Sequence, residues 1–267
     1  MSMELVNVNI GLLGCGTVGA SLCKLIDEQS DAIAERTGLK LDVVMVAVRD
    51  VSQSRDVPLD PSLFTNDSNS VIESPEVDVV VEVIGGIEPS KELILKALEL
   101  GKPVVTANKE LLAAHGGELY SLAKESEVDL LFEAAVAAAI PIMRPLRESL
   151  AGEPITRVMG IVNGTTNFIL TKMTEENMPF KNALEEAQKL GYAESDPTAD
   201  VEGHDAAAKA AIIASFAFGG QVTFSDVHVE GITKITPEDI GFAHRLNHCI
   251  KLLAIAEKQK IDGEDAL

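Results

Sequence analysis

The chain has 267 residues, and its 46% hydrophobic and 24% charged content is typical of a folded globular protein, which excludes a largely disordered one. The net charge of −20 argues against nucleic acid or an anionic membrane as a partner, but it leaves small anionic cofactors open. The three cysteines (Cys15, Cys23 and Cys249) lack metal-ligand spacing, and their odd number favours a reducing cytoplasm over a disulfide scaffold.

The first half of the chain alternates strand and helix patterns. Strands are predicted at 6–14, 39–50, 77–86, 102–109 and 128–136, and helices at 17–38, 88–101 and 110–125. The polar stretch from residue 51 to about 70 is predicted as loop. Strands separated by helices indicate βαβ units, so we expect a Rossmann-type, doubly wound parallel sheet with helices on both faces.

The regular alternation of strand and helix patterns ends near Pro141, and the pattern of the second half predicts a smaller α+β domain. We expect strands at 155–164, 225–232 and 249–259, and helices at 165–173, 180–191, from 204 and at 236–247. Thr236, Pro237 and Asp239 form a capping-box pattern. The domains predicted are 1–143 and 144–267. Because the chain ends just after a strand that needs a partner, the pattern suggests a shortened fragment.

The segment "GCGTVG" follows a strand and opens a helix, as the dinucleotide fingerprint requires. Gly14 permits the tight turn, Gly16 lets a pyrophosphate approach the backbone, and Gly19 allows close helix–strand packing. Backbone N–H groups near Thr17 and Val18 would hold phosphate. A glycine-rich turn without a ligand remains the weaker alternative.

The carboxyl ends of the other strands carry further candidates, since ligands bind at this edge of a parallel sheet. Arg49 favours NADP, while the neighbouring Asp50 keeps NAD open. The remaining predicted cofactor contacts at strand ends are Gly85, Gly86, Thr106 and Lys109.

Residues 163–166, "NGTT", join a strand to a helix. They can act as a plain N-cap or as substrate-positioning backbone, and their spacing alone favours the cap.

An acidic loop precedes the apolar helix that begins at His204. Its carboxylates are candidates for solvation, metal binding or the ammonium group of an amino-acid substrate. Asp205 and Lys209 follow it four residues apart, so they share one helix face with Ile212 and Phe216. A surface pair would contribute only a few tenths of a kcal/mol, roughly, so burial would indicate another use. The loop carboxylates are Glu194, Asp196, Asp200 and Glu202.

The ordered motifs closely resemble homoserine dehydrogenases, over about residues 7–257. They are "GLLGCGTVG", "VEVIGG", "KPVVTANKELLA", "FEAAVAAAIPIM", "GIVNGTTNFIL", "GYAESDPTADVEGHDAAAK" and "VEGI". The resemblance implies reversible NAD(P)H-dependent reduction of aspartate 4-semialdehyde to homoserine, on the route to threonine, isoleucine and methionine, in a cytoplasmic homodimer.

The resemblance also assigns residue roles. Lys209 matches the family's proton donor, and Lys109 matches a second active-site lysine. Asp205 matches a substrate-binding carboxylate, Glu194 a residue that binds the amino-acid end, and Asp200 another carboxylate of that site. Two lysines from different domains can serve one alkoxide only if the domains meet at the cofactor.

A Na⁺ site built largely from backbone carbonyls is implied at Glu133, Val136, Ala138 and Ile140. The family commonly has glycine where this chain has Ala138 and Ala139, and alanine does not readily adopt glycine-only backbone angles.

A Gly-Ala-Gly and Pro-Thr-Ala segment and a regulatory ACT domain, which occur in the family, are not in this sequence. The alternatives are a non-catalytic NAD(P)-binding paralogue, and another amino-acid or aldehyde dehydrogenase on the same fold.

Overall fold

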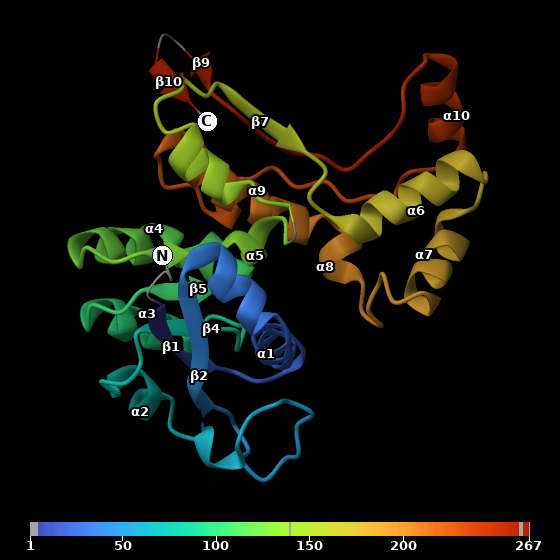
Figure 1. Cartoon of the computed structure of the whole chain (residues 1–267). Helices are drawn as coiled ribbons and strands as arrows, with labels where there is room; N and C mark the ends of the chain where they lie inside the picture. Colours follow the sequence, from blue (N-terminus) through green and yellow to red (C-terminus); the bar gives the residue numbers. More distant parts are fainter. Residues whose placement is uncertain (1–4, 139, 262–263, 267) are drawn as a thin grey trace. The chain divides into compact units, whose positions relative to one another are not determined.

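The computed structural model describes residues 5–138, 140–261 and 264–266. The chain divides into two compact units, Met1–Ala138 and Ala139–Leu267 (Figure 1). None of the helices in the described ranges has both the length and the apolar character that crossing a bilayer requires.

The first unit is built on a parallel sheet of six strands in the order β3-β2-β1-β4-β5-β6. This is the order of a dinucleotide-binding Rossmann sheet, so the predicted fold class is confirmed. The strands are β1 (Val6–Leu13), β2 (Leu39–Ala47), β3 (Phe64–Thr65), β4 (Val79–Glu82), β5 (Val104–Thr106) and β6 (Leu130–Leu131).

Helices cover both faces of this sheet. Ile10 and Leu12 of β1 pack with Cys23 and Ile26 of α1, because alternate residues of a strand point to the same face. Gly11 faces the opposite way, where a Cβ would lie 2.7 Å from Val71 of α2. The helices are α1 (Thr17–Thr37), η1 (Pro61–Leu63), α2 (Ser68–Glu73), α3 (Ser90–Glu99), α4 (Lys109–Glu125) and α5 (Glu133–Val136).

Two predictions in this unit were wrong in detail. The stretch to residue 70, predicted as loop, contains η1, β3 and most of the first turn of α2, because Asp60 and Asp67 cap helical turns there with their side chains. The strand predicted at 128–136 is limited to β6 and is followed by the helical turn of α5.

The second unit contains the antiparallel pair β7 (Arg157–Gly160) and β8 (Ala254–Glu257), against which α9 (His204–Phe218) packs (Figure 1). A separate apolar core includes Ile169, Met173 and Ala187. The other elements are η2 (Pro145–Ser149), α6 (Gly164–Glu175), α7 (Phe180–Lys189), α8 (Thr198–Val201), η3 (Phe224–Asp226), α10 (Pro237–Arg245), β9 (Gln259–Ile261) and β10 (Glu264–Ala266).

The strand predicted at 225–232 is absent from the described structure. Instead, the side chain of Asp226 accepts hydrogen bonds from the backbone N and Oγ1 of Thr223, and this closes the helical turn η3. The strand predicted at 249–259 is confined to β8 and the first residue of β9. The capping box of Thr236 and Asp239 is confirmed.

Candidate active site

The glycine loop connects β1 to α1 through a sharp turn. Gly14 has a φ of 98°, and a Cβ there would lie 2.9 Å from the carbonyl oxygen of Val83. A Cβ on Gly19 would lie 2.3 Å from the carbonyl oxygen of Gly14. Both positions therefore exclude any side chain, which is the physical basis of the first and third glycines of the fingerprint.

Gly16, the N-cap residue of α1, faces open space. No atom lies within 4 Å of the position that its Cβ would occupy. Thr17 and Val18 begin the helix, and the first N–H groups of a helix have no partner within it. This loop thus fits the pyrophosphate of a dinucleotide, which binds such N–H groups.

The loop after β2 carries two arginines. Arg49 is exposed, and its neighbour Asp50 accepts hydrogen bonds from the Ser52 side chain and backbone at 2.7 and 2.9 Å, which hold the pKa of the Asp50 carboxyl below its usual value. Arg55 donates hydrogen bonds to the carbonyl oxygens of Gln53 and Asp50 at 2.8 and 3.0 Å. The Asp50 carboxylate therefore makes its hydrogen bonds within its own loop.

Arg55 also lies over the ring of Phe64 in the neighbouring strand β3. Burial raises the pKa of the Cys15 thiol, and the positive charge of Arg55 opposes that rise. Its guanidinium is 5.6 Å from the centre of the Phe64 ring. Sequence patterns gave no reason to select Arg55.

Glu82 ties together the ends of β4 and β5. Its carboxylate is fully buried and accepts hydrogen bonds from the backbone N of Ile84 and Gly85, at 2.8 and 3.2 Å, and from Thr106 Oγ1 at 2.6 Å. Buried carboxylates are rare unless they are satisfied in this way. Glu82 therefore fixes the loop that carries Gly85.

Asn108 extends this arrangement to α4. It donates from Nδ2 to the carbonyl oxygen of Gly86 at 2.6 Å, and its Oδ1 accepts from the backbone N of Leu111, which caps the helix. Lys109 is exposed at the first position of that helix. The predicted residues Gly85, Gly86 and Thr106 thus lie in one hydrogen-bonded group at the carboxyl edge of the sheet, and Lys109 follows Asn108 at the start of α4.

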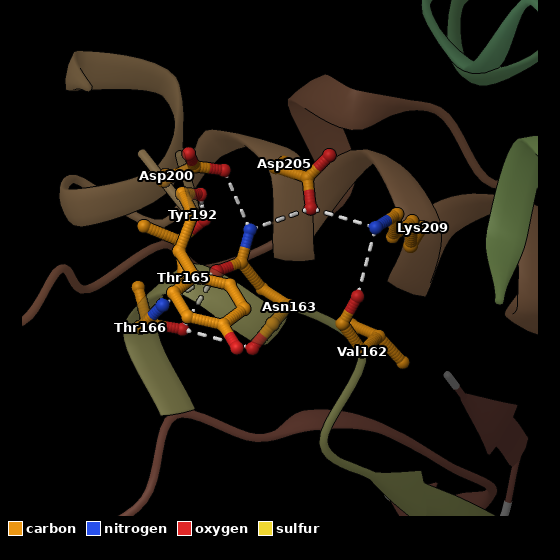
Figure 2. Close-up of polar contacts among 8 residues, drawn as sticks. All are labelled: Val162, Asn163, Thr165, Thr166, Tyr192, Asp200, Asp205 and Lys209. Carbon is orange, nitrogen blue, oxygen red and sulfur yellow. Dashed lines mark hydrogen bonds and ion pairs between the residues drawn. The ribbon is translucent and has the colours of Figure 1, made fainter. Parts of the chain in front are cut away.

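In the second unit, Asp205 and Lys209 form a buried ion pair (Figure 2). Lys209 Nζ lies 2.8 Å from Asp205 Oδ2, and the two side chains are 15% and 3% exposed. Lys209 also donates to the carbonyl oxygen of Val162 at 2.8 Å. The pair is therefore not a surface salt bridge.

Asn163 lies between two carboxylates (Figure 2). Its Nδ2 donates to Asp200 Oδ1 at 2.6 Å and to Asp205 Oδ2 at 2.9 Å, while its Oδ1 accepts from the backbone N of Thr166 at 2.8 Å. The predicted N-cap is confirmed. The amide network is the group formed by Asn163, Asp200, Asp205 and Lys209.

The remaining acidic residues are arranged differently. Asp196 accepts hydrogen bonds from the side chain and backbone of Thr198, and these bonds lower the pKa of its carboxyl. Glu194 is exposed, and its carbonyl oxygen accepts from Gln188 Nε2 at 3.0 Å. No group of three or more acidic, histidine or cysteine side chains in the described ranges is placed to hold a metal.

The proposed Na⁺ residues fall at the end of the first unit and the start of the second. Glu133 and Val136 belong to α5, and Ile140 is exposed. Ala138 has a φ of 49°, a left-handed conformation that costs an L-residue roughly 1–2 kcal/mol. Ala139 lies outside the described residues. The alanine at 138 thus adopts a positive φ at an energetic cost, as expected for a residue other than glycine.

The chain is similar to known proteins over both of its units. The family models described as "Homoserine dehydrogenase, NAD binding domain" and "Homoserine dehydrogenase" match residues 14–133 and 141–264. The homoserine dehydrogenase of Corynebacterium glutamicum is 56% identical over 94% of this chain and 56% of its own length.

Two solved structures agree with these matches. That of a homoserine dehydrogenase from Thiobacillus denitrificans has a TM-score of 0.88 and 42% identity, covering 97% of this chain and 60% of its own. A hyperthermophilic archaeal homoserine dehydrogenase mutant in complex with NADPH has a TM-score of 0.77 and 30% identity, covering 98% and 81%.

The chain belongs to the homoserine dehydrogenase family. It spans a little more than half the length of curated bacterial relatives such as those of Corynebacterium glutamicum and Mycobacterium bovis. Within this family frame, Glu82, Asn163 and Arg55 are residues that motif reasoning missed as parts of the site. Glu82 stood in the "VEVIGG" segment and Asn163 in the "NGTT" segment, so both carried a signal, whereas Arg55 stood in no motif.

Proposed function

We propose that this chain carries the homoserine dehydrogenase activity of its family, the reversible NAD(P)H-dependent reduction of L-aspartate 4-semialdehyde to L-homoserine in the synthesis of threonine, isoleucine and methionine. The single observation that supports it best is the buried Asp205–Lys209 pair. An ammonium group held in this way, in a member of this family, is suited to a proton transfer.

The bound nicotinamide would exchange the hydride with the carbonyl carbon. In the reducing direction the carbonyl oxygen becomes an alkoxide, which a proton at Lys209 Nζ would neutralise. In the oxidising direction, neutral Lys209 would take the hydroxyl proton. Asp205 keeps Nζ oriented, and Lys109 would supply a second positive charge.

In this proposal, carboxylate side chains of the second unit select the substrate. We expect Glu194, Asp200 and Asp205 to bind the α-ammonium group and hydroxyl of homoserine, since charge-assisted hydrogen bonds to ammonium are strong and directional. Substrates without a free α-ammonium group should therefore be poor. A preference for such substrates would favour another aldehyde dehydrogenase on the same fold.

For the cofactor, we expect NADP to be preferred over NAD. The support is Arg49 after β2 together with Arg55, whose guanidinium is anchored in the same loop by hydrogen bonds to the carbonyl oxygens of Gln53 and Asp50. Arginine suits a ribose 2′-phosphate, and Asp50 is engaged with Ser52. Arg49→Ala and Arg55→Ala should each raise the KM for NADPH more than that for NADH.

The roles proposed for the glycine-rich segments follow the same logic. The pyrophosphate would bind at the glycine loop and the start of α1, at Gly14, Gly16, Thr17, Val18 and Gly19. The strand-end residues Gly85, Gly86, Thr106 and Lys109 would adjoin the nicotinamide half.

Na⁺ binding by Glu133, Val136, Ala138 and Ile140 is a further proposal. It predicts a rise in thermal stability when NaCl replaces choline chloride at equal ionic strength.

We further propose a homodimer in the cytoplasm, with residues 1–143 binding the nucleotide and 144–267 serving substrate binding and dimerisation. The support is an apolar face of the β7–β8 sheet, where Met159 and Ile255 are paired in register and about half exposed. Ile255→Lys should dissociate the dimer in light-scattering measurements. The cytoplasmic assignment is supported by three free cysteines.

The experiment that tests the activity is homoserine-dependent reduction of NADP and NAD by the folded protein. Homoserine should be oxidised faster than hydroxy acids that lack the α-ammonium group. Tight cofactor binding without turnover of any such substrate would instead favour the non-catalytic paralogue.

A further inference from the structure

The side chain of Asn163 has two functions that can be separated by atom. Its Oδ1 accepts from Thr166 N at 2.8 Å and Thr166 Oγ1 at 2.9 Å, which completes the start of α6. Its Nδ2 donates both hydrogens in another direction, to Asp200 and Asp205 (Figure 2). A helix cap needs only the oxygen, so the two donated bonds need a separate explanation.

Those donated bonds join two carboxylates from different helices. Asp200 belongs to α8 and Asp205 to α9, and each places one oxygen on the same amide nitrogen. Two carboxylates that share a small space favour protonation of one of them, unless donors stabilise the charged forms. The amide donates to both and adds no charge of its own.

The same contact orients the lysine. Asp205 Oδ2 accepts from Asn163 Nδ2 at 2.9 Å and from Lys209 Nζ at 2.8 Å, so one oxygen connects the amide to the ammonium. Lys209 is further held by the carbonyl oxygen of Val162, the residue just before Asn163. The strand-to-helix turn at 162–163 therefore fixes both the acid and the lysine.

We propose that Asn163 is a positioning residue for the proposed reaction. It donates a hydrogen bond to each of Asp200 and Asp205 and holds Asp205 against Lys209, so that Nζ is aimed for proton transfer. The inference rests on the proposed function for its kinetic part. Its electrostatic part concerns the amide network alone and can be measured without substrate.

Two substitutions separate the cap from the donors. Asn163→Ser keeps a good N-cap residue but removes the amide group. Asn163→Asp keeps the cap oxygen and the size, but it places a third carboxylate against Asp200 and Asp205. Ser215→Ala is the matched control. Ser215 lies on the same helix as Lys209 but outside the amide network, and its side chain makes two hydrogen bonds of 2.9 Å with the backbone of Val222.

In steady-state kinetics with homoserine, Asn163→Ser should lower kcat about 10- to 100-fold, as expected for a residue that orients catalytic groups. The KM for the dinucleotide should stay unchanged. The isotope effect with homoserine deuterated at its hydroxyl-bearing carbon should rise, since a misplaced proton acceptor slows the chemical step. A smaller fraction of folded enzyme would lower kcat at an unchanged isotope effect, and that result would overturn the kinetic part.

The second measurement is thermal unfolding against pH. The charged groups facing residue 163 are Asp200 from α8 and Asp205 and Lys209 from α9. In Asn163→Asp, neighbouring carboxylates raise the folded-state pKa of the new group, so the stability deficit relative to Asn163→Ser should grow as pH rises from 4 to 8, roughly.

Ser215→Ala should show a deficit that does not vary over this range. If the deficit of Asn163→Asp is equally flat, the amide does not face ionised carboxylates and the proposal is overturned. If homoserine is not turned over but the deficit grows with pH, the proposed function has failed while the electrostatic role of Asn163 stands.

Discussion

Asp205 and Lys209 lie one helical turn apart on α9, with Lys209 Nζ 2.8 Å from Asp205 Oδ2 in a largely buried position. The residues around them on the helix are mostly apolar, with Ala206, Ala210 and Ile213 buried. Ionised groups in such a place are costly unless they are paired, so their presence indicates a use other than stability.

Replacing Lys209 should abolish turnover while leaving cofactor binding intact. Lys209→Met keeps the length of the side chain but removes the proton donor, so kcat should fall about 10²- to 10⁴-fold. Lys181, an exposed residue of α7 whose side chain is 84% exposed, provides the control as Lys181→Met. Near-normal turnover in Lys209→Met would remove this residue as the proton donor.

Changing Glu82 should affect the nucleotide unit selectively. Glu82→Gln turns one acceptor oxygen into a donor that faces either Thr106 or the backbone N of Ile84 and Gly85, and an unsatisfied buried group costs about 1–3 kcal/mol. Fluorescence titration should show weaker dinucleotide binding. Unaltered binding and unaltered unfolding together would show that the carboxylate does not hold this loop.

Much of the first unit was predictable from sequence because its signals are local. Continuous valines predicted β4, and the spaced glycines predicted the turn before α1. The short strand β3 was missed, because two residues carry no periodic pattern and their pairing with β2 is set by the tertiary structure.

The second unit was predicted less well, for two physical reasons. Residues 225–232 alternate like a strand, yet the Thr223–Asp226 capping interactions close a turn at their start. The spacing of Asp205 and Lys209 predicted their pairing, since they lie on one helix. Asn163 is some forty residues away in sequence, so its contact with Asp205 depended on the fold.

Replacing either of two glycines in the second unit with alanine should change the free energy of unfolding, but in opposite directions. A Cβ on Gly231 would lie 2.5 Å from the carbonyl oxygen of Val201, next to the turn that leads into α9, whereas a Cβ on Gly241 would meet nothing within 4 Å. Gly231→Ala should lower the free energy of unfolding by about 1–3 kcal/mol. Gly241→Ala, inside α10, should raise it by about 0.5–1 kcal/mol.

Urea unfolding of the two variants checks this pair, with Gly241→Ala showing that an added methyl group is not harmful in itself. Loss of the expected difference in sign would mean that the 229–231 segment does not pack closely on residues 201–202.

The cysteines should differ in reactivity. Cys249 is exposed, whereas Cys15 and Cys23 are buried, and burial raises the pKa of the Cys23 thiol to about 11. A thiol reagent at neutral pH should therefore modify Cys249 first, as peptide mass spectrometry can determine. Fast labelling of Cys23 in the native protein would contradict the packing of α1 on β1.

The Cys23 pKa also predicts an alkaline effect. Because the folded-state pKa is raised above its unfolded value of 9.0, Cys23 contributes stability below pH 9, and that contribution is lost as pH rises toward about 11. Cys23→Ala should unfold with a shallower dependence on pH over this window. An identical dependence in both proteins would exclude Cys23 as the titrating group.

The most direct test of the account is the rate at which the folded protein reduces NADP when homoserine is added, measured beside Lys209→Met. The account predicts homoserine-dependent reduction that is lost in the variant while dinucleotide binding is retained. A protein that binds the dinucleotide but shows no homoserine-dependent reduction, or one whose reduction survives the loss of Lys209, would contradict it.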